Sequence, residues 1–165
     1  MKAQRKNGQA HQAGVSLVEV LVSVLILSIG LLGIAAMQAT ALRNGQSSLE
    51  RSQAVVQTYS ILDAIRADRD NIALYDTGGE RCAAATAPTG ASSQQVAAND
   101  VLNDWVASLK NALGAPGDSS SCGRVACAAG VCTVTVRWDD SRGTARGGSN
   151  AAGSSTRQAV TVAQI

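Results

Sequence analysis

The chain has 165 residues, of which 45% are hydrophobic, 16% charged and only 2% aromatic. This length suits one domain with an anchor and argues against two independent cores. The net charge of +2 is too small to indicate nucleic-acid binding, and Lys2, Arg5 and Lys6 leave residues 15–165 with a net charge of −1. We therefore expect no nucleic-acid partner and read the basic start as a topology signal.

The N-terminal region joins a polar, basic segment to a long apolar one. Residues 1–14 are polar or small, and residues 20–37 read VLVSVLILSIGLLGIAAM. As a helix, these eighteen residues would span roughly 27 Å, close to the hydrocarbon thickness of a bilayer. The positive-inside rule predicts a cytoplasmic N-terminus, with residue 43 onward outside the cytoplasm.

One acid, Glu19, lies at the edge of the apolar run. A cleaved signal peptide is one hypothesis, since Ala39-Thr40-Ala41 offers an A-x-A site, but the run exceeds the usual apolar region of roughly 7–15 residues. A plain single-pass anchor is a second hypothesis. It does not explain Glu19, because an acid near the centre of a spanning helix costs about 2.5–3.5 kcal/mol.

Gly14 followed by an apolar stretch, with Glu19 five residues after it, resembles the prepilin peptidase site of type IV pilins and type II secretion pseudopilins. The resemblance implies cleavage between Gly14 and Val15 and methylation of the new amine of Val15. It also implies that Glu19 pairs with an N-terminal amine during assembly. Family members usually carry Phe at the first mature position, and Val15 keeps an apolar side chain there. The implied partners are prepilin peptidase, other pilin subunits and, before assembly, the membrane; no cofactor is implied.

The segment after the apolar run also reads as helix. Residues 38–70 contain no Pro, and Gly45 is the one weak position, so we expect a helix from about residue 16 to residue 70. Two helices broken near Asn44-Gly45 are the alternative. A single apolar stripe is predicted to face a partner: Leu42, Leu49, Val56, Leu62 and Ile65. The charged residues are predicted on the wetter face: Glu50, Arg51, Asp63, Arg66, Asp68 and Arg69.

Four cysteines follow the apolar segment: Cys82, Cys122, Cys127 and Cys132. An even number in a domain outside the cytoplasm favours disulfides. A metal site is disfavoured, because no Cys-x-x-Cys pair occurs and the single His lies at position 11. Four cysteines allow three connectivities, and the sequence does not choose among them.

The C-terminal part predicts a small head. Residues 76–95 read as a surface loop, and residues 96–114 as a helix in which Trp105 anchors an apolar face. Its apolar positions are Val101, Leu102, Trp105, Leu109 and Leu113, with Gly114 and Pro116 as stop signals. Strands are expected at residues 132–138 and 157–165, with a shorter one at 123–127, in an antiparallel sheet with one polar face. Residues 139–156 are expected to form a polar loop, with Asp139 and Asp140 as solvated turn residues and not a calcium site.

This order of elements predicts an α+β fold: a long N-terminal helix, half apolar and half amphipathic, packed on a small antiparallel sheet. It resembles the pilin fold. The stretches SLVEVLVSVLILSIGLLGIAAMQ and CTVTVRWDD are similar to the PilV family of minor pilins, the type IV pilus modification proteins. The implied segments are a leader at 1–14, a membrane or filament-core helix at 15–42, an amphipathic half at 43–75 and a periplasmic head at 76–165.

The sequence carries no catalytic pattern. No His follows residue 11, which excludes Ser-His and Cys-His nucleophiles from the chain after the leader, and no Walker loop or dinucleotide fingerprint occurs. We expect a non-enzymatic minor pilin of the inner membrane that then joins a pilus on the cell surface. A minor pseudopilin of a type II secretion system is the alternative, and a secreted binding module released by signal peptidase is an alternative of another class.

Overall fold

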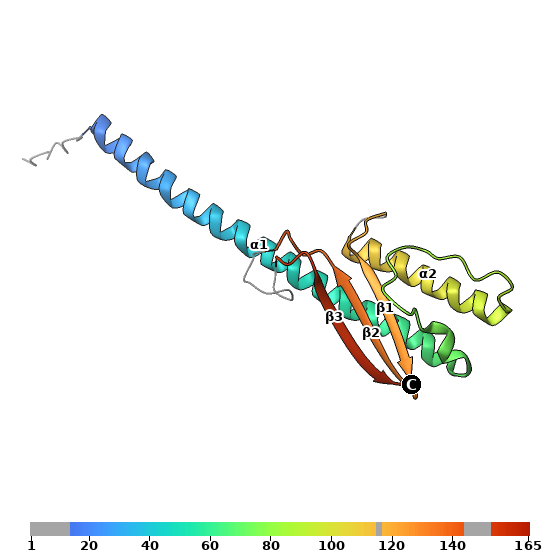
Figure 1. Ribbon diagram of the computed structural model, residues 1–165. Coiled ribbons are helices and arrows are strands. Elements are labelled where there is room, and N and C mark those ends of the chain that lie inside the picture. The colour runs from blue at the N-terminus through green and yellow to red at the C-terminus, as the bar shows by residue number, and fades with distance from the viewer. Residues whose placement is uncertain (1–13, 115–116, 144–152) are drawn as a thin grey trace, which may run out of the picture. The chain divides into compact units, whose positions relative to one another are not determined.

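The computed structural model describes residues 14–114, 117–143 and 153–165. The predicted leader apart from Gly14, the stop signal Pro116 and the middle of the predicted loop 139–156 lie outside the described residues. The chain divides into two units, Met1–Ala39 and Thr40–Ile165. In chain order the elements are α1 (Leu17–Ala67), the 3₁₀ segment η1 (Arg69–Tyr75), α2 (Ser93–Leu113), β1 (Cys122–Ala128), β2 (Val131–Trp138) and β3 (Arg157–Gln164) (Figure 1).

α1 contains Gly45 in its interior, so the alternative of two helices broken at Asn44-Gly45 is wrong. The helix ends at Ala67, close to the expected residue 70, and η1 continues the chain to Tyr75. Helix-forming neighbours on both sides offset the cost of one glycine, roughly 1 kcal/mol. In the first unit, the described residues include the apolar part of α1, whose side chains are all exposed.

The second unit packs helices on one face of a three-stranded antiparallel sheet of order β1-β2-β3. α2 begins at Ser93, three residues before the expected start, because Ser92 and Gln95 form a capping box. The β1–β2 turn has positive φ at Ala129 (49°) and Gly130 (77°), as a two-residue type I′ hairpin requires. The α+β prediction is confirmed, including both helices and the three strands.

The core lies between the sheet and the helices. Val134, Val136 and Trp138 of β2 are fully buried, as the alternation in this strand predicts. Trp105 is also buried, and its indole N–H donates to Gln57 O of α1 at 2.9 Å. The other large buried side chains are Ile61, Leu62, Ile65, Tyr75, Leu102, Val106, Leu109, Leu113 and Val125.

The predicted single stripe on α1 is wrong. Leu62 and Ile65 are buried, whereas Leu42 and Val56 are 75% and 58% exposed, and Leu49 is exposed as well. At about 100° per residue, Ile65 lies roughly 180° around the helix from Val56, so the heptad leucines cannot share its face. The face that packs on the head instead carries Ser47, Glu50, Ala54, Gln57, Thr58, Ile61, Leu62 and Ile65.

A pair of hydroxyl groups joins α1 to β3. The β2–β3 register pairs Val134 with Thr161, which places Thr161 on the inner face, where its hydroxyl bonds to that of Thr58 at 2.8 Å. The same alternation turns Val160 and Val162 outward, at 55% and 62% exposure. The expectation of a polar outer face is therefore wrong for β3.

Candidate functional site

The N-terminal segment places the predicted processing residues in an accessible position. Gly14, Val15 and Ser16 precede α1 without regular structure, and all three are exposed. Ser16 O accepts the first helical hydrogen bonds, from Glu19 N at 3.0 Å and Val20 N at 3.2 Å. A protease needs an accessible peptide bond outside regular structure, and the bond between Gly14 and Val15 meets this requirement.

Glu19 lies in the first turn of α1, where the helix macrodipole favours a negative charge. Every other side chain from Val15 to Met37 is apolar or small, including three serines. Ser23 and Ser28 satisfy their hydroxyls within the helix by donating to Glu19 O and Val24 O, each at 2.7 Å. Glu19 is thus the one ionisable group of this segment.

The apolar part of α1 lacks a covering layer. The helix is long and apolar enough to cross a membrane by length and composition, and its apolar window is entirely exposed. Leu17, Leu25 and Leu32 are 77%, 61% and 72% exposed, and similar values hold along the run. A surface of this kind needs lipid or other helices around it.

The comparison with protein families settles the class of this segment. Residues 9–35 match the prokaryotic N-terminal methylation motif. The match supports a protein of the type IV pilin-like class, pilin or pseudopilin, and with the fold it favours a structural subunit over an enzyme. No curated protein matches the chain, and no solved structure matches it either.

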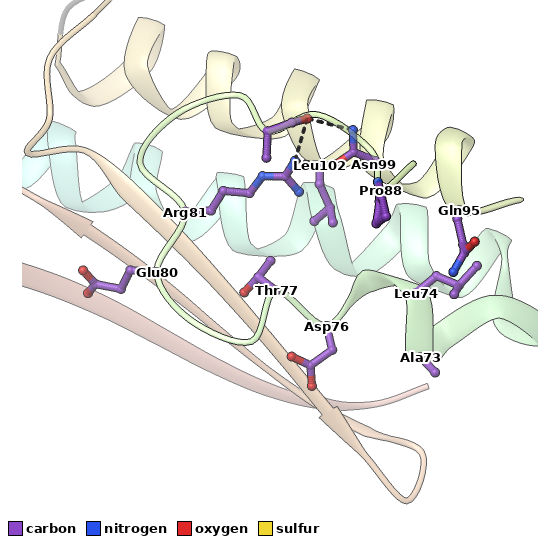
Figure 2. Close-up of a pocket in the computed structure, with 11 residues that line it drawn as sticks. Ala73, Leu74, Asp76, Thr77, Glu80, Arg81, Pro88, Gln95, Asn99 and Leu102 are labelled. Carbon is purple, nitrogen blue, oxygen red and sulfur yellow. Dashed lines mark hydrogen bonds between the residues drawn. The ribbon is translucent and has the colours of Figure 1, made fainter. Parts of the chain in front are cut away.

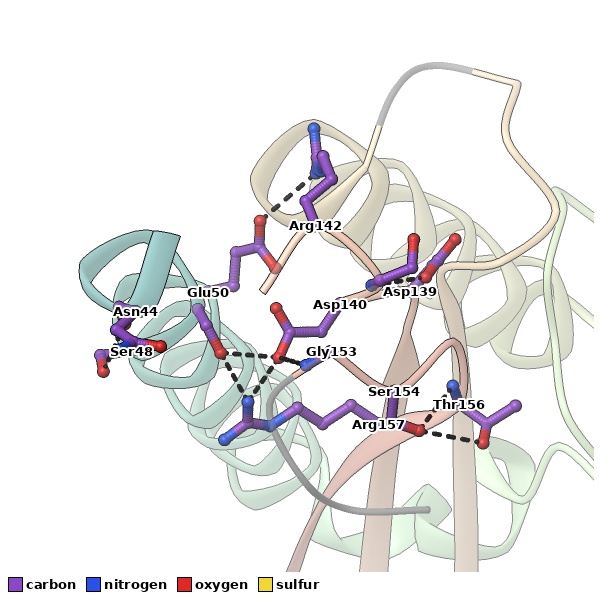
Figure 3. A network of polar contacts seen from close by, with 12 residues as sticks. Asn44, Ser48, Glu50, Asp139, Asp140, Arg142, Gly153, Ser154, Thr156 and Arg157 are labelled. Atoms are coloured by element: carbon purple, nitrogen blue, oxygen red, sulfur yellow. Dashed lines mark hydrogen bonds and ion pairs between the residues drawn. The ribbon is translucent and has the colours of Figure 1, made fainter. Parts of the chain in front are cut away.

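In this pilin-like chain, a buried ion pair fastens the end of β2 and the start of β3 to α1 (Figure 3). Arg157 Nη1 bonds to Asp140 Oδ2 at 2.5 Å and to Ser47 Oγ at 2.6 Å, and Ser47 Oγ bonds to Asp140 Oδ2 at 2.6 Å. Arg157 also lies over the Trp138 ring, 5.8 Å from its centre. The prediction of Asp140 as a solvated turn residue is wrong, because it is 1% exposed.

Glu50 is a charged residue on the packed face of α1, contrary to the prediction that it lies on the wetter face. It is 7% exposed and pairs with Arg142 at 3.3 Å. Burial raises the pKa of the Glu50 carboxyl; the Arg142 charge opposes this shift and the Asp140 charge adds to it. Asp140, Arg142 and Arg157 are distant in sequence from α1, so no local pattern indicated these pairs.

All four cysteines are paired in the head, as Cys82–Cys122 and Cys127–Cys132. The first disulfide joins the loop after η1 to β1. The second crosses the β1–β2 hairpin, where its two residues are partners in the strand register. In the chain-entropy model, the longer loop is worth about 4 kcal/mol and the shorter about 2 kcal/mol, for sequence separations of 40 and 5 residues.

The head has a cavity of about 410 Å³ beside the loop that carries Cys82 (Figure 2). Its charged groups are engaged in holding that loop. Arg81 Nη2 donates to Asn99 Oδ1 at 2.5 Å and Asn103 Oδ1 at 2.7 Å, and Glu80 pairs with Arg137 at 2.9 Å. Burial lowers the pKa of the Arg81 guanidinium. Arg81 and Glu80 therefore hold the cavity wall together by bonding to other protein groups.

Proposed function

We propose that this chain is a minor type IV pilin of the PilV kind, which helps to initiate or modify a pilus. The observation that carries the proposal is the combination of Gly14, Glu19 and an uncovered apolar helix within the matched motif. The similarity of residues 16–38 and 132–140 to PilV proteins gives the narrower assignment. A minor pseudopilin is the second candidate, because the matched motif is common to both classes.

In the proposed pathway, prepilin peptidase cuts between Gly14 and Val15 and methylates the amine of Val15. Residues 1–14 are then the leader, residues 15–42 the membrane or filament-core helix, residues 43–75 the amphipathic half and residues 76–165 the periplasmic head. The basic leader supports a cytoplasmic N-terminus. After assembly the subunit lies in the pilus at the cell surface.

Glu19 has a specific part in this pathway. A carboxylate costs free energy in lipid, and so does the charged amine created at Val15 by cleavage. When one subunit docks on another, the amine of the first and the Glu19 carboxylate of the second offset each other's cost. Charge pairing then favours lateral entry of subunits into the filament in the correct register.

The experiment replaces Glu19 with Ala in the full chain, in a strain that lacks the native copy. We expect normal membrane insertion and a reduced number of surface pili, counted by electron microscopy. Asp63→Ala is the matched control, because Asp63 is an exposed acid on the same helix, where it pairs with Arg66. Unchanged piliation in the Glu19 variant would remove the assigned role, and a defect in protein secretion with normal pili would favour the pseudopilin.

A further inference from the structure

The Cys82–Cys122 disulfide lies against a guanidinium group. Arg137 Nη2 is 3.1 Å from Cys122 Sγ and 3.9 Å from Cys82 Sγ, with an N–H directed at each sulfur. Arg137 comes from β2, where it is the register partner of Cys122 on β1. The strand pairing therefore fixes the cation beside one particular sulfur.

The two sulfurs of this disulfide differ in access. Cys122 is 1% exposed, whereas Cys82 is half-buried in the loop after η1. Thiol–disulfide exchange needs an accessible sulfur to attack, and its rate rises when the departing sulfur is a stabilised thiolate. Cys82 is the more accessible cysteine of the two and therefore the one open to attack. Cys122, with Arg137 against it, is the better leaving group.

We propose that Cys82–Cys122 is a thiol–disulfide exchange site, in which a dithiol attacks Cys82 and Arg137 stabilises the departing thiolate of Cys122. The attacking thiolate donates an electron pair to Cys82 Sγ and forms a mixed disulfide, while the Cys82–Cys122 bond breaks and its electron pair remains on Cys122 Sγ. The second thiolate of the dithiol then attacks the dithiol's first sulfur, which is bonded to Cys82 in the mixed disulfide. Cys82 leaves as a thiolate and takes a proton from water, and the dithiol is oxidised to a cyclic disulfide.

The groups around the disulfide determine how strongly the departing Cys122 thiolate is stabilised. Glu80 holds Arg137 through Nε at 3.0 and 3.1 Å, and one carboxylate oxygen of Glu80 lies within 4.8 Å of both sulfurs. Glu80 therefore fixes the guanidinium in place but opposes a negative charge on sulfur. Ser119 O lies 3.4 Å from Cys122 Sγ and favours the neutral thiol once the bond is broken. Arg137 is the group that favours the thiolate, through a charged N–H at hydrogen-bond distance.

The Cys127–Cys132 disulfide is an internal reference. Cys132 is fully buried, and an anion contacts the backbone of its partner, since Asp76 Oδ2 accepts a hydrogen bond from Cys127 N at 3.3 Å. No arginine or lysine contact with its sulfurs occurs among the described residues. A carboxylate raises the free energy of a nearby thiolate, so this bond should exchange more slowly.

Exchange at the first disulfide would affect a defined part of the head. Besides the disulfide, the loop after η1 is held to β1 by a two-way backbone bridge between Arg81 and Gly123, at 2.7 and 3.0 Å. The same loop lines the cavity of about 410 Å³. Opening this bond in the assembled protein would loosen the cavity wall and leave the β1–β2 hairpin closed by its own disulfide.

The test measures reduction of the full-length chain in detergent by dithiothreitol at pH 7. Samples are quenched with an alkylating reagent and mapped by mass spectrometry after tryptic digestion. Trypsin places Cys82 and Cys122 on different peptides and keeps Cys127 and Cys132 together on one, so the two bonds are followed separately. We expect the Cys82–Cys122 bond to be reduced first.

Three variants test the role of Arg137. Arg137→Gln should slow reduction of the Cys82–Cys122 bond by about threefold to tenfold, because the departing thiolate loses its charged hydrogen-bond donor. Glu80→Gln should have the opposite effect and speed reduction of the Cys82–Cys122 bond. Arg124→Gln, at an exposed position on β1, removes the same charge away from the sulfurs and should change nothing. This variant loses the tryptic cut between Cys122 and Cys127, so its Cys82–Cys122 bond is followed on the peptide that carries Cys82.

Equal rates in the Arg137 variant and the unchanged chain would overturn the proposal, as would faster reduction of the Cys127–Cys132 bond. The Glu80 variant keeps the test decisive if loss of Arg137 impairs folding. Slower reduction in that variant would also contradict the assignment, because removal of an anion should help the thiolate to leave.

Discussion

Replacing Arg157 with Met removes one half of the buried ion pair. Loss of one partner of such a pair typically costs 3–5 kcal/mol, because the other charge is left uncompensated. Asp140 keeps its hydrogen bond from Ser47 at 2.6 Å, which reduces the loss, while the lost contact between Arg157 and the Trp138 ring adds to it. We expect the free energy of unfolding of the head to fall by about 3–4 kcal/mol, which corresponds to a fall in melting temperature of roughly 10–15 °C for a head of this size.

Tryptophan fluorescence during urea unfolding of the full chain in detergent measures this loss. Trp105 and Trp138 are both buried in the head, so their signal reports the head and not the apolar helix, which detergent keeps helical. Arg66→Met is the matched control, since its pair with Asp63 is 38% and 71% exposed and is worth less than about 1 kcal/mol. A loss below about 1 kcal/mol in the Arg157 variant would refute the reasoning.

Gly123→Ala should destabilise the head by about 1–3 kcal/mol, because the new Cβ would lie 2.4 Å from a Trp105 ring carbon and 2.9 Å from Leu109 Cδ1. Gly79→Ala, where nothing lies within 4 Å of a Cβ, should be near neutral, and equal urea midpoints for the two variants would contradict this packing. Glu50→Gln should stabilise the head more at pH 7.5 than at pH 4. Burial raises the pKa of the folded carboxyl above the ordinary 4.5, so the unfolded chain loses its proton first and the stability of the native protein falls as pH rises from there. A pH-independent difference between the Glu50 variant and the native chain would contradict that sign.

The sequence predicted the elements whose periodicity is local. β2 alternates through Val134, Val136 and Trp138, and all three are buried. The helix of residues 96–114 was predicted from its apolar spacing and lies at Ser93–Leu113. Such patterns follow directly from the geometry of a strand or helix that packs on one side.

The predictions of which side of each element packs on the rest of the fold were less successful. The exposed Leu42 and Leu49 continue a heptad pattern, but a helix turns by 100° per residue, and the face that packs on the head lies elsewhere on α1. Val160 and Val162 face outward because the register with β2 sets the parity of β3. Asp140 was read as a turn residue, since its partner Arg157 follows a long loop.

The candidate processing site was assigned from a motif and not from the periodicity of its residues. The roles assigned to Gly14, Val15 and Glu19 come from their spacing and from the matched motif. The structure adds that Gly14 and Val15 are exposed and precede the helix. The disulfide pairing was open in the sequence, because the loop after η1 reaches β1 only through the tertiary fold.

The N-terminal mass of the mature protein, purified from membranes, tests the central claim most directly. Processing as a prepilin predicts a chain that begins at Val15 and carries one methyl group on its amine. A chain that begins at Leu42 would contradict the claim and indicate release by signal peptidase after Ala41. An unprocessed chain that begins at Met1, in cells with active prepilin peptidase, would contradict it as well.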